Sequence, residues 1–360
     1  MLTNIRRIFP FGSRTIKTGI SVFFTSLLCM ALDFPVIFAV ITAIVTVENT
    51  AANSVKKALI RFPASALGAF IAVSLYGWLG ITPLTYALAT ILTIGVCYKL
   101  KLYDGILVAT ITAVAMIPGM GENYFVDFFI RLATTTIGIV VSSAVNFVLL
   151  PPNYLMQIQK SSSQNFRNAS LLFKDIVRKH FQAEEQRSWT ELRRKSQNLT
   201  ESIDRNYRWL QYQREEWKYH KYKKEEAKEM QLLQHKLHVI RQVAFHIGNL
   251  NYIKISGELF DASQKQLILK AVDSICDTLS DSEHSFPNEH FDDIYHVDLL
   301  FWEWRKGHTN IHSSSNYHHH FAPEIMFLYE ILCIHDLSEE LYTLEKRHQT
   351  NKRELPFQPT

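Results

Sequence analysis

The first 150 residues or so are almost continuously apolar, and this feature restricts the possible folds more than any other. A helix needs roughly 20 apolar residues, about 17–25 in practice, to cross a bilayer. Six segments qualify or nearly do so: 17–32, 34–50, 58–78, 82–98, 104–118 and 127–150. We therefore expect an all-α membrane domain with six transmembrane helices over residues 1–152.

The rest of the chain has a different composition, rich in Lys, Arg, Glu, Gln and His. Pro151 and Pro152 end the last apolar segment, since proline cannot continue a helix. A length of 360 residues accommodates one membrane domain and one soluble domain. We expect a cytoplasmic all-α domain over residues 153–350 and a tail over 351–360.

The charge balance and the cysteines exclude several function classes. A net charge of only +4 gives no support for a general role with nucleic acid. The four cysteines are scattered and form no CxxC pair, so neither a disulfide framework nor a zinc site is indicated. No phosphate loop, GxSxG, HExxH or paired-carboxylate motif is present, so the sequence predicts neither an ATP-driven pump nor an enzyme, and no cofactor.

Basic residues mark alternate loops of the apolar half. They precede the first segment and lie between the second and third and between the fourth and fifth, at Arg6, Arg7, Arg14, Lys17, Lys56, Lys57, Lys99 and Lys101. The other loops are acidic or uncharged. The excess of Lys and Arg in cytoplasmic loops predicts a multi-pass cell-membrane protein with both termini in the cytoplasm. The first apolar segment lacks a small-residue cleavage site, so we interpret it as a retained span.

Two sequence patches recur at an offset of 70 residues. IRFPASALG at 60–68 is followed by IRLATTTIG at 130–138, and the tripeptide Ile-Thr-Ala at 41–43 returns at 111–113. Small residues recur on one helix face in both copies, as in close helix packing in lipid. We interpret residues 16–80 and 86–150 as repeats of three spans, which must be inverted because three is odd. Chance similarity between apolar sequences is the alternative.

The repeat places one arginine in each half. Arg61 is expected near the cytoplasmic end of the third span and Arg131 near the outer end of the sixth, where they attract anions from both sides. Arg131 is alternatively paired with Asp127, and either arginine alternatively extends to the head groups. Thr42 and Thr112 either line the substrate path or bond their own backbone.

Further polar residues lie at predicted helix ends. Glu48, Asn49 and Asn53 follow the second span, in the position of a broken-helix substrate and ion site. Asp104 opens the fifth span, either as an N-cap or as a protonatable coupling residue. Our candidate set therefore assigns Asn49 and Asn53 to substrate binding and Glu48 and Asp104 to ion coupling.

The stretch RTIKTGISVFFTSLLCMALDFPVIFAVITAIVTVENTAANSVKKALIRFPASALGAFIAV resembles the start of the bacterial aromatic acid exporter family, in its Gram-positive branch. KLKLYDGILVATITAVAMIPG and NFVLLPPNY fit the same branch. The wider group includes fusaric acid resistance proteins and, more distantly, aluminium-activated malate transporters. The resemblance implies six spans, a cytoplasmic helical domain and export of aromatic or other organic carboxylates.

The polar half has helical periodicity throughout. Residues 205–230 predict part of one extended amphipathic helix, and further helices are expected near 231–255, 263–281, 289–306 and 323–346. The segment 308–320 is rich in histidine and is interpreted either as a flexible loop or as a metal or pH sensor.

Three functions remain open at this point. The first is a gradient-driven secondary exporter of organic anions; the second is a gated organic-anion channel; the third is a membrane-anchored helical scaffold or sensor. The small repeats enclose little volume, so we expect a homo-oligomer whose other partners are lipid and small organic anions.

Overall fold

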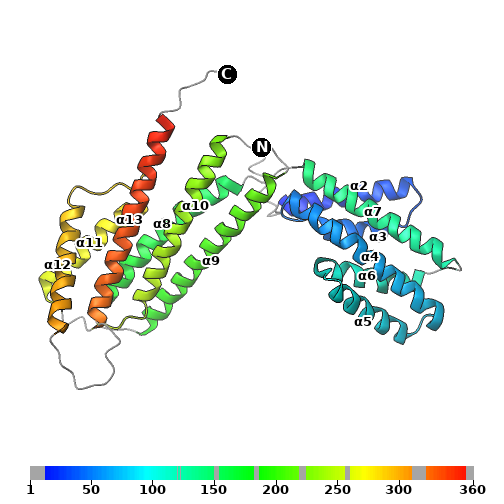
Figure 1. Cartoon of the computed structure of the whole chain (residues 1–360), viewed down its shortest axis with the longest axis horizontal. Coiled ribbons are helices and arrows are strands. Elements are labelled where there is room, and N and C mark those ends of the chain that lie inside the picture. Colours follow the sequence, from blue (N-terminus) through cyan, green and yellow to red (C-terminus); the bar gives the residue numbers. More distant parts are fainter. Residues whose placement is uncertain are drawn as a thin grey trace. The chain divides into compact units, whose positions relative to one another are not determined.

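The computed structural model describes residues 13–119, 121, 123–149, 154–181, 186–218, 224–255, 260–309 and 322–353 (Figure 1). Every element in these ranges is a helix, which confirms the predicted all-α class. The chain divides into two compact units, one of residues 1–153 with 212–221 and one of the remainder.

The helices of the first unit are α2 (Ser13–Ala31), α3 (Val36–Thr46), α4 (Ala51–Leu79), α5 (Pro83–Lys99), α6 (Ile106–Met116) and α7 (Tyr124–Val148). Two of them, α4 and α7, are long and apolar enough to cross a bilayer. At 11 residues each, α3 and α6 extend about 16 Å, roughly half of a hydrocarbon core. The predicted second span, 34–50, is longer than its helix, which ends at Thr46. The predicted fifth span, 104–118, lies within the apolar helical stretch Tyr103–Gly119, because α6 continues at both ends into short 3₁₀ helices.

The start of α4 differs from the predicted start at residue 58. Thr50 is the N-cap, and its hydroxyl accepts a hydrogen bond from the Asn53 N–H at 3.1 Å. Since the helix begins at Ala51, Arg61 lies about three turns inside it instead of at its end.

The first unit has small and hydroxylated residues inside and large apolar residues outside. Its buried positions include Ala39, Ala64 and Ala109. Its surface carries Phe70 and Trp78, of which Trp78 is 92% exposed. This distribution reverses that of a water-soluble bundle and matches helices that pack through small residues with lipid around them.

Helix pairing in the first unit follows the 70-residue offset. The bounds of α3 and α6 differ by 70 at both ends. The contact between α2 and α3 corresponds to that between α5 and α6. In the same way, the contact of α3 with α7 corresponds to that of α6 with α4, and the contact of α2 with α7 to that of α5 with α4. The third helix of each predicted repeat therefore packs on the first two helices of the other.

Two glycines make equivalent close contacts. A Cβ on Gly68 would lie 2.3 Å from the carbonyl oxygen of Ala109, and one on Gly138 would lie 2.5 Å from that of Ala39. Both pairs are related by the same offset, since 138 − 68 and 109 − 39 each equal 70. Only glycine allows these backbones so close, so both recurring glycines have a packing role.

The second unit contains the helices α8 (Tyr154–His180), α9 (Gln186–Glu216), α10 (Lys224–Leu250), α11 (Ala262–Ser280), α12 (His290–Thr309) and α13 (Pro323–Arg353), with the end of α9 grouped with the first unit. Its core is that of a soluble bundle, with Phe173, Leu237 and Phe327 fully buried. The prediction of one helix across 205–230 was wrong. After Glu216, the Lys218 N–H bonds the Glu215 carbonyl three residues back, which closes the helix in a turn.

Candidate functional site

A buried guanidinium lies at the centre of the first unit. Arg131 of α7 is only 2% exposed. Its Nη2 donates a 2.7 Å hydrogen bond to the hydroxyl of Thr112 on α6. Its guanidinium carbon lies 4.2 Å from the ring centroid of Phe38 on α3, within the range of a cation–π contact.

Hydroxyl groups from three helices meet beside this arginine. The Ser65 hydroxyl on α4 lies 2.9 Å from that of Thr112 and 3.5 Å from that of Thr135 on α7. Ser65 and Thr135 are 70 residues apart and therefore occupy equivalent positions in the predicted repeats. Arg131, Thr112, Ser65, Thr135 and Phe38 together form what we call the central site.

The positive charge of the central site has no carboxylate partner among the described residues. The Nε and Nη1 atoms of Arg131 are buried without hydrogen-bond partners. The proposed pair with Asp127 is absent, because that carboxylate accepts the Gly121 N–H at 2.8 Å. A buried, uncompensated guanidinium is costly unless an anion joins it, and its planar fork suits a carboxylate. The site is therefore chemically suited to bind an anion.

Arg61 has a different environment. Its Nη2 forms a 2.7 Å ion pair with Glu48, and its Nη1 and Nε donate to the carbonyls of Val45 at 2.9 Å and Asp104 at 3.2 Å. Lys57 reaches the same Glu48 carboxylate at 3.2 Å. Every nitrogen of this guanidinium has a partner, so Arg61 joins α4 to the ends of α3 and α6.

The sequence explains why the two arginines differ. At the 70-residue offset, Glu48 corresponds to Pro118 and Asp104 corresponds to Phe34. The second repeat thus has no carboxylate in place of the one that neutralises Arg61. Neither arginine extends to the surface, so the head-group interpretation is wrong for both.

Two candidate residues from the sequence have other contacts. Thr42 is buried and donates to the Phe38 carbonyl at 2.9 Å, so its hydroxyl bonds its own helix. Asp104 is not an N-cap, because Leu102 holds that position in the short 3₁₀ helix Tyr103–Gly105. The Asp104 carboxylate lies 3.9 Å from Lys57.

The last turn of α9, grouped with the first unit, contacts the polar segment after α3. Glu216 accepts the Ala51 N–H at 2.8 Å, and Glu215 accepts from the Asn53 side chain at 2.7 Å. Asn49 donates to the Tyr212 hydroxyl at 3.1 Å. Carboxylates are favourable at a helix N-terminus, so these acids stabilise the start of α4.

A second polar cluster, which we did not predict, joins the ends of α2 and α7. Lys17 is buried and donates to the Asn146 side-chain oxygen at 2.9 Å. The Asn146 amide donates in turn to Ser54 at 2.6 Å and to the carbonyls of Glu48 and Thr50. These bonds satisfy backbone groups left open where α3 ends.

The sequence contained a signal for part of what we missed. Ser65 and Thr135 both carry hydroxyls at the same offset as the arginines, so a comparison by chemical type would have found them. Phe38 and Asn146 had no such signal, because their equivalents are Val108 and Tyr76.

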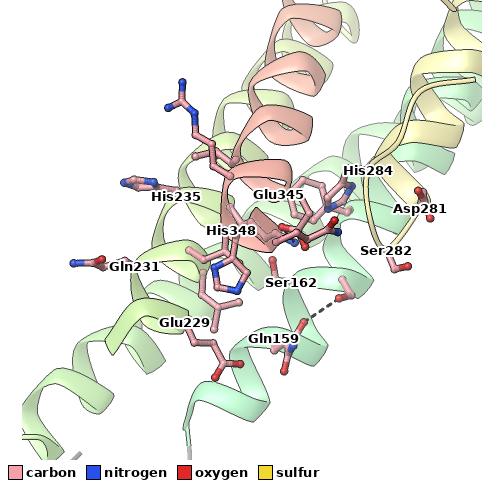
Figure 2. Close-up of a pocket in the computed structure, with 18 of the residues that line it drawn as sticks. Gln159, Ser162, Glu229, Gln231, His235, Asp281, Ser282, His284, Glu345 and His348 are labelled. Atoms are coloured by element: carbon pink, nitrogen blue, oxygen red, sulfur yellow. Dashed lines mark hydrogen bonds and ion pairs between the residues drawn. The ribbon is translucent and has the colours of Figure 1, made fainter. Parts of the chain in front are cut away.

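The second unit contains a cavity of about 890 Å³ with many polar and charged residues among those that line it (Figure 2). It lies between α8, α10, α13 and the segment after α11, with Ser162 and His284 among its walls. The Ser162 hydroxyl is buried without a partner, and Lys236 pairs with Glu345 at 3.0 Å. Both acidic and basic side chains line the cavity, so it does not favour a ligand of one charge over the other.

Of the histidine-rich segment 308–320, residues 310–320 lie outside the described residues, and residues 308 and 309 are the last two of α12. Elsewhere, His290 and His335 form a buried pair with ring nitrogens 3.0 Å apart. Burial and the neighbouring His335 lower the pKa of His290 to about 4. The pair is therefore neutral near pH 7. Among the residues that the structure describes, no three His, Cys, Asp or Glu side chains group as metal ligands.

The first unit has an apolar outer surface, small residues inside and a buried cationic centre. These features are those of a helical membrane protein. Residues 9–149 match the sequence profile of aromatic acid exporter family member 1. A UPF0421 protein of Bacillus cereus (strain ATCC 10987 / NRS 248) is 38% identical over 348 residues, covering 97% of each chain. A UPF0421 protein of Halalkalibacterium halodurans is 35% identical over 348 residues, covering 96% of this chain and 93% of the relative. The chain belongs to the UPF0421 proteins within the aromatic acid exporter family.

Proposed function

We propose that the protein is a gradient-driven secondary exporter of organic monocarboxylates, with Arg131 as the group that binds the carboxylate. The observation that carries this proposal is a guanidinium that is 2% exposed, with two nitrogens unbonded and no described carboxylate beside it. Thr112 and Ser65 supply hydroxyls for the second carboxylate oxygen. One uncompensated positive charge favours a ligand with one negative charge.

The aromatic preference in this proposal is based on Phe38. Its ring lies against the guanidinium, and an aromatic substrate brings a second flat, polarisable surface to the same group. An aliphatic acid of the same charge lacks that contact. Family membership supports transport of this general type.

The proposed transport mechanism is based on two inverted repeats in a multi-pass membrane domain with both termini in the cytoplasm. The equivalent glycine contacts and the Ser65–Thr135 pair support the two-fold relation. In inverted-repeat transporters the substrate lies where the repeats meet, and the repeats rock around it. Burial of the central site favours an occluded carrier over the alternative, a gated channel with an open path.

The coupling role of Glu48 and Asp104 is part of the same proposal. Glu48 holds both Arg61 and Lys57, so a coupling ion that binds this carboxylate competes with two cations at once. The Asp104 carboxylate lies near Lys57, and its backbone carbonyl accepts a hydrogen bond from Arg61. Asp104 lies just before α6, so release of Arg61 and Lys57 would be felt at the start of that helix.

Uptake into proteoliposomes with a panel of aromatic and aliphatic carboxylates tests the proposal. We expect Arg131→Gln to abolish uptake and Arg131→Lys to retain a small part, because lysine keeps the charge but loses the planar fork. Phe38→Leu should reduce the ratio of aromatic to aliphatic uptake. Arg241→Gln, a change at an exposed arginine of the second unit, is the matched control.

Three results would contradict the proposal. Unchanged uptake in Arg131→Gln would remove the central site from the mechanism. Single-channel currents in planar bilayers would favour the channel. If neither flux nor current occurs while the helical unit binds a protein partner, the scaffold or sensor function is favoured.

A further inference from the structure

The cavity of the second unit has a buried floor beneath a charged rim. The buried residues among those that line it are Ser162, Phe166, Leu233, Leu279 and His284. Three of these side chains are apolar and two are polar. The volume of about 890 Å³ falls within the range of about 300–1,000 Å³ that is usual for small-molecule sites, which combine apolar walls with a few placed polar groups.

Ser162 on α8 gives the floor an unused hydrogen-bonding group. Its side chain is 2% exposed, and its hydroxyl has no hydrogen-bond partner among the described residues. In Figure 2, Ser162, His284 and Glu345 come from three different segments and lie around the same part of the cavity. Buried hydroxyls normally have a partner, so a ligand that supplies one is favoured here.

An ion pair joins α10 and α13 at the wall of the cavity. Lys236 Nζ lies 3.0 Å from Glu345 Oε2, and the two side chains are 14% and 15% exposed. These atoms are close but not aligned for a hydrogen bond, so the buried Oε2 has no hydrogen-bond donor among the described residues. The wall therefore presents one ammonium and one carboxylate, and both can bind a further group.

His284 adds an acceptor to the floor. Its Nδ1 lies 3.0 Å from the Thr278 carbonyl oxygen, so Nδ1 carries a hydrogen and donates it. Burial, and then the nearby Lys236, lower the pKa of His284, which keeps the ring neutral near pH 7. In the neutral ring the other nitrogen, Nε2, is an acceptor. His284 is thus not a further cation of the cavity.

The ion pair restricts the charge that a ligand can carry. A ligand with only a negative charge meets Glu345, and one with only a positive charge meets Lys236. A zwitterion satisfies both, because its ammonium donates to Glu345 and its carboxylate accepts from Lys236. Such charge-assisted hydrogen bonds are stronger than neutral ones. Ser162 and His284 remain for the other polar atoms of the ligand.

From these groups we propose that the cavity binds a small zwitterion of the α-amino acid class. Glu345 and Lys236 bind its two charges, and Ser162 supplies a hydrogen bond. The apolar part of the floor, Phe166 with its leucine neighbours, contacts an apolar side chain. None of these residues belongs to the central site, so this is a second site with a different ligand chemistry.

Calorimetric titration of the full-length protein in lipid nanodiscs tests the charge requirement. Phenylalanine, phenethylamine and 3-phenylpropanoate share one ring and differ in charge, and leucine is a second zwitterion. The Arg131→Gln background removes carboxylate binding at the central site. We expect phenylalanine to bind about tenfold more tightly than either singly charged compound. Equal affinity for one of those compounds, or no binding of either amino acid, would overturn the proposal.

Substitutions in the cavity provide a second test in the same assay. Ser162→Ala removes a hydroxyl that bonds no described residue, so folding is unaffected while phenylalanine affinity should fall about fivefold. Glu345→Gln should lower it about tenfold and remove the preference for phenylalanine over 3-phenylpropanoate. A purely structural role of Glu345 would not change that preference.

Arg241→Gln, at an exposed arginine that does not line the cavity, is the control and should bind phenylalanine like the parent protein. Unchanged phenylalanine affinity in both Ser162→Ala and Glu345→Gln would refute this site. An equal loss in the control would do so as well, because the effect would not then be specific to the cavity.

Discussion

At the residue scale, the two recurring arginines have diverged in role. Both are buried, but only Arg61 has a carboxylate, Glu48, at 2.7 Å. Arg131 has hydroxyls and an aromatic ring instead. The sequence predicted the pair of arginines and treated them as equivalent. The difference arises at one pair of equivalent positions, where the first repeat has Glu48 and the second has Pro118. Arg61 is therefore neutralised and Arg131 is not.

We expect Arg61→Leu to destabilise the membrane unit by about 3 kcal/mol, because it leaves the Glu48 carboxylate partly buried with Lys57 alone. Arg61→Leu combined with Glu48→Leu should recover much of that loss, since no charge is then left unpaired. Thermal unfolding in detergent measures both. If the double variant is no more stable than the single one, the ion pair is not the reason for the loss.

At the element scale, short helices and close glycine contacts decide the packing. Hydropathy located all six helices of the first unit but not their ends. The ends depend on local hydrogen bonds, such as the Thr50 cap of α4, and on the polar groups that Asn146 satisfies after α3. Composition averaged over a 20-residue window does not contain this information.

We expect Gly68→Ala to lower the unfolding temperature by several degrees, because the new methyl group meets the Ala109 carbonyl oxygen at 2.3 Å. Gly95→Ala on α5 is the matched control: nothing lies within 4 Å of its Cβ, and alanine is about 1 kcal/mol better than glycine inside a helix. Equal effects of the two changes in the same thermal assay would show that the α4–α6 contact has room to adjust.

At the scale of the whole molecule, the proposed mechanism requires the repeats to move against each other. Ser65 and Thr135 lie at the contact between α4 and α7, with hydroxyl oxygens 3.5 Å apart. A covalent link there should stop rocking without removing the guanidinium. This separates the transport cycle from binding, which the arginine variants alone do not.

We expect Ser65→Cys combined with Thr135→Cys to keep part of the uptake when reduced, because Arg131 and the Thr112 hydroxyl remain, and to lose it after oxidation, with recovery on adding reductant. Each single cysteine variant serves as its own control, because it cannot form the same link. Proteoliposome uptake before and after oxidation is the measurement. Full activity in the cross-linked protein would exclude relative motion of the repeats at this contact.

The sequence alone determined the helical class, the approximate helix positions, the family and the two arginines, because these depend on hydropathy and on local repetition along the chain. Only the tertiary structure showed that Arg131 is buried without a carboxylate, while Arg61 is paired, and that Ser65 meets Thr135. Charge compensation depends on which side chains from distant helices come within a few ångströms of one another. That information arises from packing and is not contained in any single segment.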